Sequence, residues 1–324
     1  MPNILTHALM ANDVLQDLKD IKLKEIILKY PQVFSMATSG PDFLFYYKAL
    51  PMQDATLGKP IHDLGNKVHS KNINAFYQNA INIIKSTEDN ELLIAFLAGH
   101  LMHWSLDVKA HPFVFNRSGE MGGKTKYWHY RFESMMDTMM VQQIKGYRLD
   151  ATRTFDCVHS KAGDRERLAA FYRDIVSRTY HEDIMLDIYA ESMESMYTLA
   201  KWLFDPYGFK FPVVQGIERM LDVDWKYSSH MVIGDVDTKH DVLNLKRKPW
   251  MHPVSGDVSD KSFLDLYNEA VLLGQAVLYC LNDIIVHDKQ TSLDDLIRDR
   301  SYDTGMKDAG AMRFYASVYE HGNL

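Results

Sequence analysis

Four polar side chains lie on one stripe of an otherwise apolar segment, and this stripe constrains the fold more than any other feature. The residues are His100, His103, Asp107 and His111. Because a helix turns by about 100° per residue, their spacings place them within an arc of roughly 80°. The other faces of the segment are apolar, so we expect a buried helix whose polar stripe points inward or into a cleft. Buried imidazoles and carboxylates need partners, and a metal ion can satisfy several of them at once.

A second predicted helix carries His129, Glu133 and Asp137 at i, i+4 and i+8, so these side chains also share one face. An isolated pair of this kind usually lies on a solvated surface. Two such helices facing each other would instead supply about six or seven ligands, enough for two or three metal ions. The two cysteines, Cys157 and Cys280, form no CxxC pair. The ligands are therefore nitrogen and oxygen atoms, which favours zinc, with iron as the main rival.

The overall composition limits the class of partner. The charge balance of 36 basic against 43 acidic residues, a net charge of −7, gives no basic excess for a phosphate backbone, so we expect no nucleic-acid partner. The first residues lack a basic region followed by a long apolar run, which predicts a cytoplasmic protein. Neither a bilayer-spanning stretch nor an amphipathic anchor stands out, so we expect no stable membrane anchor. The sequence leaves the oligomeric state open.

Apolar residues recur at helical spacing along most of the chain, and the alternation typical of strands is scarce. The pattern predicts an all-α fold with helices over 6–29, 66–85, 91–110, 127–145, 165–178, 184–204, 217–220, 262–285 and 292–299. We expect Pro112 to end the third of these helices. We also expect one multi-helix domain, in which 1–145 form a metal-binding core, 146–324 complete it, and a long loop runs near 230–260.

The order of these polar residues resembles the zinc-dependent phospholipase C family over about the first 140 residues. The resemblance is carried by His7, Gly40-Pro41-Asp42, His69, His100-x-x-His103-x-x-x-Asp107, His111-Pro112 and His129-x-x-x-Glu133. It implies an all-helical phosphodiester hydrolase, of a fold type shared with single-strand nucleases, that holds a cluster of zinc ions in a cleft.

The resemblance also implies the ligands of each ion, which fall into three sets. The first set is Asp42, His69, His103 and Asp107; the second is His111, His129 and Glu133; the third is His7, Asp107 and the N-terminal amine of Met1, or of Pro2 after trimming. In the first set His62 is an alternative to His69, which we prefer because Val68-His69-Ser70 is expected to open a helix with an apolar opposite face. His100 has no place in these sets, and we expect it to orient a ligand.

The implied chemistry is attack of a metal-activated water on phosphorus, with two or three zinc ions offsetting the developing charge. By the same resemblance Asp42 is the candidate general base. The substrate would be a lipid or a small-molecule phosphodiester.

Three other classes of protein compete with this interpretation. An HD-type phosphohydrolase needs a His-Asp doublet on a helix, and His62-Asp63 lies beside Gly58, Pro60 and Gly65 in what we expect to be a loop. A di-iron carboxylate bundle needs two Glu-x-x-His motifs, which the helical pairs here do not match. A helical scaffold with structural metals stays open, and metal removal distinguishes it, because a scaffold would lose its fold.

Overall fold

Helices form almost all of the regular structure in the computed structural model, which describes residues 3–19, 21–123, 125–223, 225–235, 237 and 239–319. The α-helices are α1 (Ile4–Asp17), α2 (Lys22–Lys29), α3 (Pro31–Ala37), α4 (Lys59–Ser70), α5 (Ile73–Lys85), α6 (Glu91–Ser118), α7 (Lys126–Met139), α8 (Thr154–Cys157), α9 (Ala162–Tyr180), α10 (Leu186–Leu203), α11 (Phe211–Met220), α12 (Phe263–Ile285) and α13 (Asp294–Ile297). Short segments of tighter or wider helix are η1 (Gly40–Tyr46), η2 (Ala55–Gly58), η3 (Met140–Ile144), η4 (Leu149–Ala151) and η5 (Ser228–His230). The predicted all-α class is confirmed.

The strands are two short pairs. Strand β1 (Phe204–Asp205) pairs in parallel with β2 (Val232–Ile233), and β3 (Trp250–Met251) pairs antiparallel with β4 (Val258–Ser259). Both pairs involve residues of the predicted long loop near 230–260. The predicted division of the chain at residue 145 stays a prediction.

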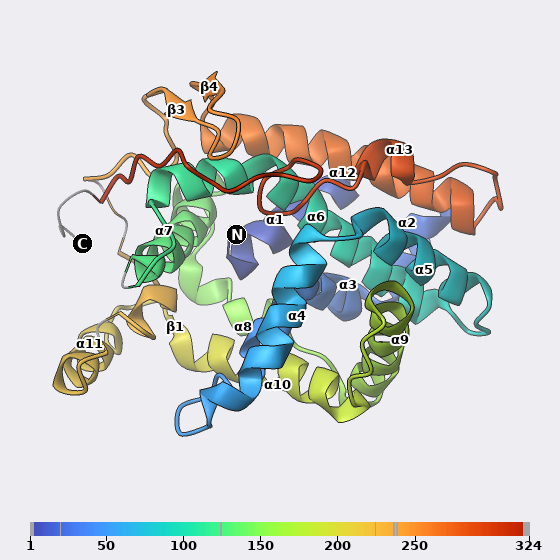
Figure 1. Cartoon of the computed structure of the whole chain (residues 1–324), viewed down its shortest axis with the longest axis horizontal. Coiled ribbons are helices and arrows are strands. Elements are labelled where there is room, and N and C mark those ends of the chain that lie inside the picture. Colours follow the sequence, from blue (N-terminus) through green and yellow to red (C-terminus); the bar gives the residue numbers. More distant parts are fainter. Residues whose placement is uncertain are drawn as a thin grey trace.

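Helix α6 is the central element of the fold, and α12, α3, α2 and α1 pack around it (Figure 1). It is buried along nearly its whole length because its sequence is apolar on every face except the polar stripe. His100, His103 and Asp107 are fully buried and His111 is 3% exposed. The expectation of a buried helix with an inward-facing polar stripe is therefore confirmed.

The prediction that Pro112 ends this helix is wrong, because α6 continues through Pro112 to Ser118. A proline inside a helix leaves the carbonyl four residues earlier, here that of Val108, without its helical hydrogen bond. Gly305 of the C-terminal segment packs against this carbonyl, and an added Cβ there would lie 2.4 Å from Val108 O. Tertiary packing thus covers the group that the proline leaves unpaired.

Two other predicted helices are each divided in the structure. The range 6–29 contains two helices, α1 and α2. The next helix, α3, begins at Pro31, because proline is well suited to a first helical turn. The range 66–85 is divided between α4 and α5 at Asn72, whose φ of 56° is left-handed. Consequently His69 lies near the end of α4, although we had expected it to lie at the start of a helix.

The C-terminal segment returns along the second half of α6 (Figure 1, red). Backbone amides of Ala316 and Val318 donate to the carbonyls of Asn116 and Arg117 at 2.7 and 2.8 Å. These bonds lie just beyond the polar stripe of α6, and Gly305 of the same segment packs against Val108, which lies within the range of the stripe. None of the helices in the described ranges combines the length and apolarity that crossing a bilayer requires.

Candidate metal centre

Three groups of imidazole and carboxylate side chains meet at the polar stripe of α6, and each group could hold a metal ion. In the first group, Asp42 comes from η1, His69 from α4 and His103 from α6. Asp42 Oδ1 lies 3.1 Å from His69 Nε2 and 3.8 Å from His103 Nε2. Distant parts of the chain thus bring the Gly-Pro-Asp turn and two histidines to one point.

The second group joins α1 to α6. His7 Nε2 lies 3.3 Å from Asp107 Oδ1, and His103 Nε2 lies 3.0 Å from Asp107 Oδ2. The rings of His7 and His103 stack with centroids 4.1 Å apart. His103 therefore belongs to both the first and the second group, and the two carboxylate oxygens of Asp107 face different histidines. Met1 and Pro2, whose amine the resemblance assigns to this site, lie outside the described residues.

The third group joins the end of α6 to α7. It consists of His111, His129 and Glu133. Glu133 Oε1 lies 3.0 Å from His129 Nε2, one helical turn earlier on α7, and 4.0 Å from His111 Nε2 across the helix interface. The structure thus brings together all eight residues that the sequence singled out, in three adjacent groups.

The hydrogen bonds of the histidines orient them for metal binding. Nδ1 of His103 bonds Thr38 O at 2.9 Å, and Nδ1 of His69 bonds Gly65 O at 2.7 Å. A carbonyl oxygen only accepts, so Nδ1 of each ring carries a proton, and Nε2 is the atom that faces the carboxylates and would bind a metal ion. Nδ1 of His129 lies 2.9 Å from Ser118 Oγ, a hydroxyl that can either donate or accept the hydrogen bond. Such contacts fix the tautomer that a metal ligand needs.

The buried atoms of the second group fit a cation. His7 Nε2, His103 Nε2 and both oxygens of Asp107 are buried, and none has a hydrogen-bond partner among the described residues despite the short separations. A lone pair of neutral His103 and an oxygen of Asp107 repel each other at 3.0 Å unless a proton or a metal ion lies between them. The donor set, imidazole and carboxylate without thiolate, suits zinc.

Burial keeps most of these imidazoles neutral. Loss of hydration lowers the pKa of His7 to about 4 and lowers the pKa values of His111 and His129 well below the usual range. His69 differs: burial alone would lower its pKa, but its hydrogen bond to Asp42 and the charge of that carboxylate raise it to about 9. A metal ion bound at His69 would have to displace this proton.

Gly40 lets the turn that carries Asp42 approach α6. Its φ is 52°, and an added Cβ would lie 2.3 Å from Cδ2 of His103. The turn therefore tolerates no side chain at this position, which explains the glycine of the Gly-Pro-Asp motif in physical terms.

Two residues that the sequence left open lie outside the three groups. His62 Nε2 bonds Tyr47 O at 3.1 Å, and Asp63 is exposed and paired with Lys59. The His62-Asp63 doublet lies in α4, so our expectation that it occupies a loop is wrong. Neither member of the doublet joins a group of candidate ligands among the described residues, which removes the reason for an HD-type site.

His100 and Asp137 support the centre from outside it. His100 Nδ1 lies 3.0 Å from the hydroxyl of Tyr77, which bonds the hydroxyl of Tyr302 at 2.8 Å, and the Tyr302 ring packs 5.1 Å from that of His69. His100 is thus connected to His69 through two tyrosines. Asp137 accepts hydrogen bonds from the backbone amides of Leu5 and Thr6, so it fixes the start of α1, which carries His7.

Asp303 is a residue of the centre that the sequence reasoning missed. Its Oδ1 lies 3.7 Å from Nδ1 of His111, and the side chain is 31% exposed. It belongs to the irregular segment after α13, where neither helical spacing nor a motif marks it. The amide of its neighbour Tyr302 donates to His69 O at 2.9 Å and helps to attach the segment to the centre.

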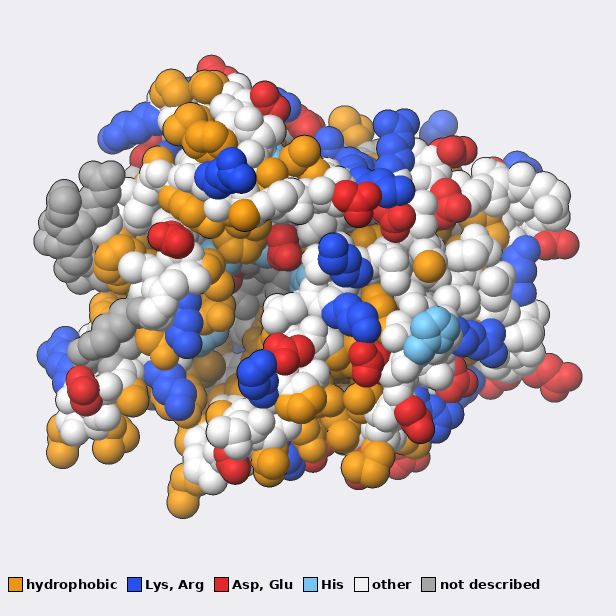
Figure 2. Space-filling model, in the orientation of Figure 1, with side chains coloured by type: hydrophobic (Ala, Val, Ile, Leu, Met, Phe, Trp, Pro, Cys, Tyr) orange, Lys and Arg blue, Asp and Glu red, His pale blue; other side chains and the backbone are white. Residues whose placement is uncertain are grey.

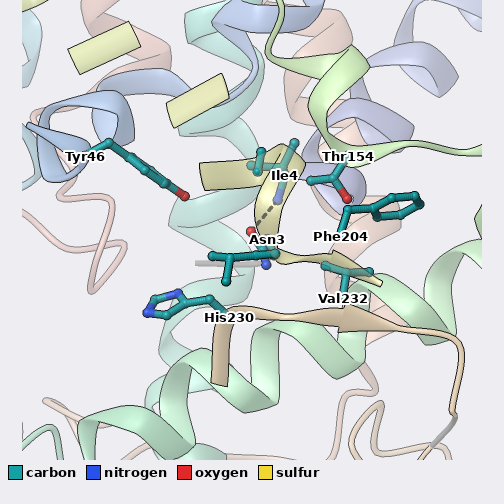
Figure 3. Close-up of a pocket in the computed structure, with 9 residues that line it drawn as sticks. Asn3, Ile4, Tyr46, Thr154, Phe204, His230 and Val232 are labelled. Carbon is teal, nitrogen blue, oxygen red and sulfur yellow. Dashed lines mark hydrogen bonds between the residues drawn. The ribbon is translucent and has the colours of Figure 1, made fainter. Parts of the chain in front are cut away.

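A cavity opens beside the start of α1 (Figure 3). Its walls include Asn3 and Ile4, Tyr46 from η1, and Phe204, His230 and Val232 from the strands and the turn before β2. Tyr46 belongs to the same turn as Asp42, and the His230 ring stacks on Tyr130, the neighbour of His129, at 4.3 Å. In Figure 2 the surface is hollowed between α4 and α7, with histidine side chains visible in the hollow. The elements that carry the ligands therefore also shape an opening.

Comparison with known proteins gives one match. The family described as zinc dependent phospholipase C matches residues 6–191, which is more than half of the chain and extends past the first 140 residues or so in which the motifs lie. No curated protein and no solved structure matches the chain. The matched range contains every residue of the three ligand groups and ends before Asp303. One conclusion follows from the all-helical fold of the chain, its buried groups of metal-ligand side chains and this match: the chain belongs to the zinc dependent phospholipase C family.

Proposed function

We propose that this protein hydrolyses the phosphodiester bond of a phospholipid or a related small molecule at a cluster of two or three zinc ions. One observation carries the proposal: three groups of buried candidate ligands lie side by side along the stripe of α6, and two of them share His103. Adjacent metal ions are typical of enzymes that displace groups at phosphorus, because the ions contact both the attacking and the leaving oxygen. Membership of the family supports phosphodiesters over carboxylic esters.

Each group would hold one ion. Asp42, His69 and His103 would hold the first, His7 with Asp107 the second, and His111, His129 and Glu133 the third. Bound zinc would supply a water molecule whose pKa is lowered toward 7. Its positive charge would stabilise the negative charge that develops on the phosphate oxygens in the transition state. The residues of this chain supply the geometry and the fixed tautomers, and burial keeps His7, His111 and His129 neutral, as ligands must be.

Asp42 is our candidate for the general base. Its side chain is 17% exposed, whereas Asp107 is fully buried between two histidines. Asp42 can therefore meet a water molecule that enters from the hollow while one of its oxygens stays near His69. In this role Asp42 accepts the proton of the attacking water and passes it to solvent or to the leaving oxygen.

The test combines metal analysis with an assay. We expect two or three zinc ions per chain by mass spectrometry, and zinc-dependent hydrolysis of a chromogenic phosphodiester and of phosphatidylcholine. In protein that retains its full zinc content, Asp42→Asn should lower kcat by about a hundredfold with little change in KM, because the carboxylate acts on the water and not on the substrate's remote groups. Asp63→Asn, an exposed carboxylate on α4, is the matched control and should behave as wild type.

Two results would contradict the proposal. Less than one ion per chain, in protein never exposed to chelators, would remove the metal centre. Fully metallated protein that cleaves no phosphodiester in a broad panel, and that unfolds when its metal is removed, would indicate the structural-metal scaffold instead.

A further inference from the structure

Tyr302 contacts two candidate ligands of the first group without belonging to any ligand group itself. Its ring centroid lies 5.1 Å from that of His69 and 5.8 Å from that of His103. Its backbone amide donates to His69 O at 2.9 Å. Tyr302 is 1% exposed and belongs to the segment after α13, beyond the residues 6–191 that match the family. The family match therefore assigns no role to this residue.

A small hydrogen-bond network connects the hydroxyl of Tyr302 to α6. This hydroxyl lies 2.8 Å from the hydroxyl of Tyr77 on α5. The Tyr77 hydroxyl in turn lies 3.0 Å from His100 Nδ1 and 3.3 Å from His100 O. Tyr77 and His100 are as fully buried as Tyr302, and the loss of hydration lowers the pKa of His100 well below its usual range. His100 is therefore neutral and carries a single ring proton.

A count of the polar hydrogens indicates the direction of each bond in this network. The oxygen of Tyr77 can accept two hydrogen bonds and donate one. Every hydrogen is paired when His100 Nδ1–H and the Tyr302 hydroxyl both donate to Tyr77, whose own hydroxyl donates to His100 O. The other tautomer would place a buried proton on His100 Nε2, which has no hydrogen-bond partner among the described residues. Buried N–H groups without a partner are rare, so the first arrangement is favoured.

Tyr302 is thus held at both its backbone and its hydroxyl, and its ring restricts two imidazoles. A hydrogen bond at Nδ1 fixes one atom of each imidazole, and the ring can still tilt about that atom. Tyr302 packs against the rings of both His69 and His103, which restricts the tilt. Their Nε2 atoms are thereby kept 3.1 and 3.8 Å from Oδ1 of Asp42. Ligands that are oriented before a metal ion arrives lose less entropy when they bind it.

We propose that Tyr302 positions His69 and His103 for the first metal ion, and that Tyr77 and His100 hold Tyr302 in place. The proposal rests on the proposed function in that it takes the first group as a zinc site. Tyr302 acts only through the two imidazoles, so it is a positioning residue. Its loss should weaken zinc binding at the first group and leave the third group unchanged.

The experiment is a chelator competition titration of the zinc-loaded protein, with urea unfolding as the measure of stability. Tyr302→Leu should weaken zinc binding by about tenfold, a loss typical of residues that orient metal ligands. Tyr302→Phe keeps the ring and removes only the hydroxyl, so we expect a smaller loss of about threefold. The matched controls are Tyr267→Leu and Tyr267→Phe on α12, because Tyr267 is also buried and its hydroxyl donates to Asp13 at 2.7 Å. They should lower stability and keep wild-type zinc affinity.

A double-mutant cycle separates positioning from a general loss of stability. In a His69→Ala background the first group is already broken, so Tyr302→Leu should cause little further loss of zinc affinity. In a His129→Ala background the first group is intact, so the loss of about tenfold should persist.

Three results would overturn the positioning role. These are wild-type zinc affinity in Tyr302→Leu, an equal loss of affinity in Tyr267→Leu, and a full effect of Tyr302→Leu in the His69→Ala background. If Tyr302→Leu does not fold, Tyr302→Phe decides the proposal by the same comparisons.

An assay with a chromogenic phosphodiester separates this proposal from the proposed function. Hydrolysis by the wild type, together with unchanged zinc affinity in the Tyr302 variants, removes only the positioning role. The expected zinc losses in a protein that cleaves no phosphodiester support the positioning role and remove only the phosphodiesterase.

Discussion

Nδ1 of His111 on α6 lies 3.7 Å from Oδ1 of Asp303, a residue of the C-terminal segment beyond the range that matches the family. Nε2 of the same histidine faces Glu133. This separation is too long for a hydrogen bond, but a carboxylate charge so close to the ring makes the imidazole more basic. The C-terminal segment therefore lies beside the candidate metal centre, although the candidate ligands all lie before residue 134.

We expect Asp303→Asn to weaken zinc binding at the third group by roughly tenfold, because it removes a negative charge 3.7 Å from the His111 ring. A zinc-chelator competition titration measures the loss. Asp295→Asn, an exposed acidic residue of α13, serves as the control. Equal zinc affinity in wild type and Asp303→Asn would show that Asp303 does not support His111.

Substitutions of Asp107 and His129 should have different effects on metal content. Asp107 faces both His7 and His103, so Asp107→Asn is expected to disturb the first and second groups together. His129→Ala should empty only the third group. Mass spectrometry of the purified variants counts the ions, with circular dichroism to check that each remains helical. An equal loss of zinc in both variants would contradict a shared role for Asp107.

Gly40→Ala should damage the first group without touching a ligand. The new methyl group would collide with His103, and φ of 52° is unfavourable for alanine. We expect a loss of about 1–3 kcal/mol in the free energy of unfolding, together with loss of zinc. Gly163→Ala is the control, because nothing lies within 4 Å of an added Cβ there. Wild-type stability and zinc content in Gly40→Ala would argue against the close approach of the turn to α6.

The stability of the protein should depend on His230 in acid. Burial lowers its pKa to about 4, below the usual value of 6.5. Between these two pH values the unfolded chain binds a proton that the folded protein does not, so the free energy of unfolding falls as pH falls. His230→Phe removes this contribution to the pH dependence of the free energy of unfolding. Between pH 7 and pH 5 we expect the wild type to lose about 1–2 kcal/mol more than the variant in urea unfolding experiments. Parallel pH profiles would show that His230 is not buried in its neutral form.

The sequence by itself determined the helical class and the buried polar stripe of α6, because a spacing of three or four residues on a helix fixes which side chains share a face. The set of eight candidate ligands, with His7, Asp42 and His69 from other parts of the chain, came instead from the resemblance to the zinc-dependent phospholipase C family. Reasoning from spacing failed at Pro112 and at Asn72, because the course of the chain there depends on contacts from elsewhere, such as Gly305 against the carbonyl of Val108.

Only the tertiary structure decided how the eight residues are divided into groups, and which further residues join them. His103 is shared by two groups because η1, α1 and α4 approach it from different directions, and no spacing along the sequence records those directions. Asp303 lies in an irregular segment without periodicity, so its contact with His111 arises only when that segment packs along α6. The exposure of the apolar side of α11 could not be predicted either, because a short apolar run in a sequence usually indicates buried residues. Only the fold shows that these residues are exposed.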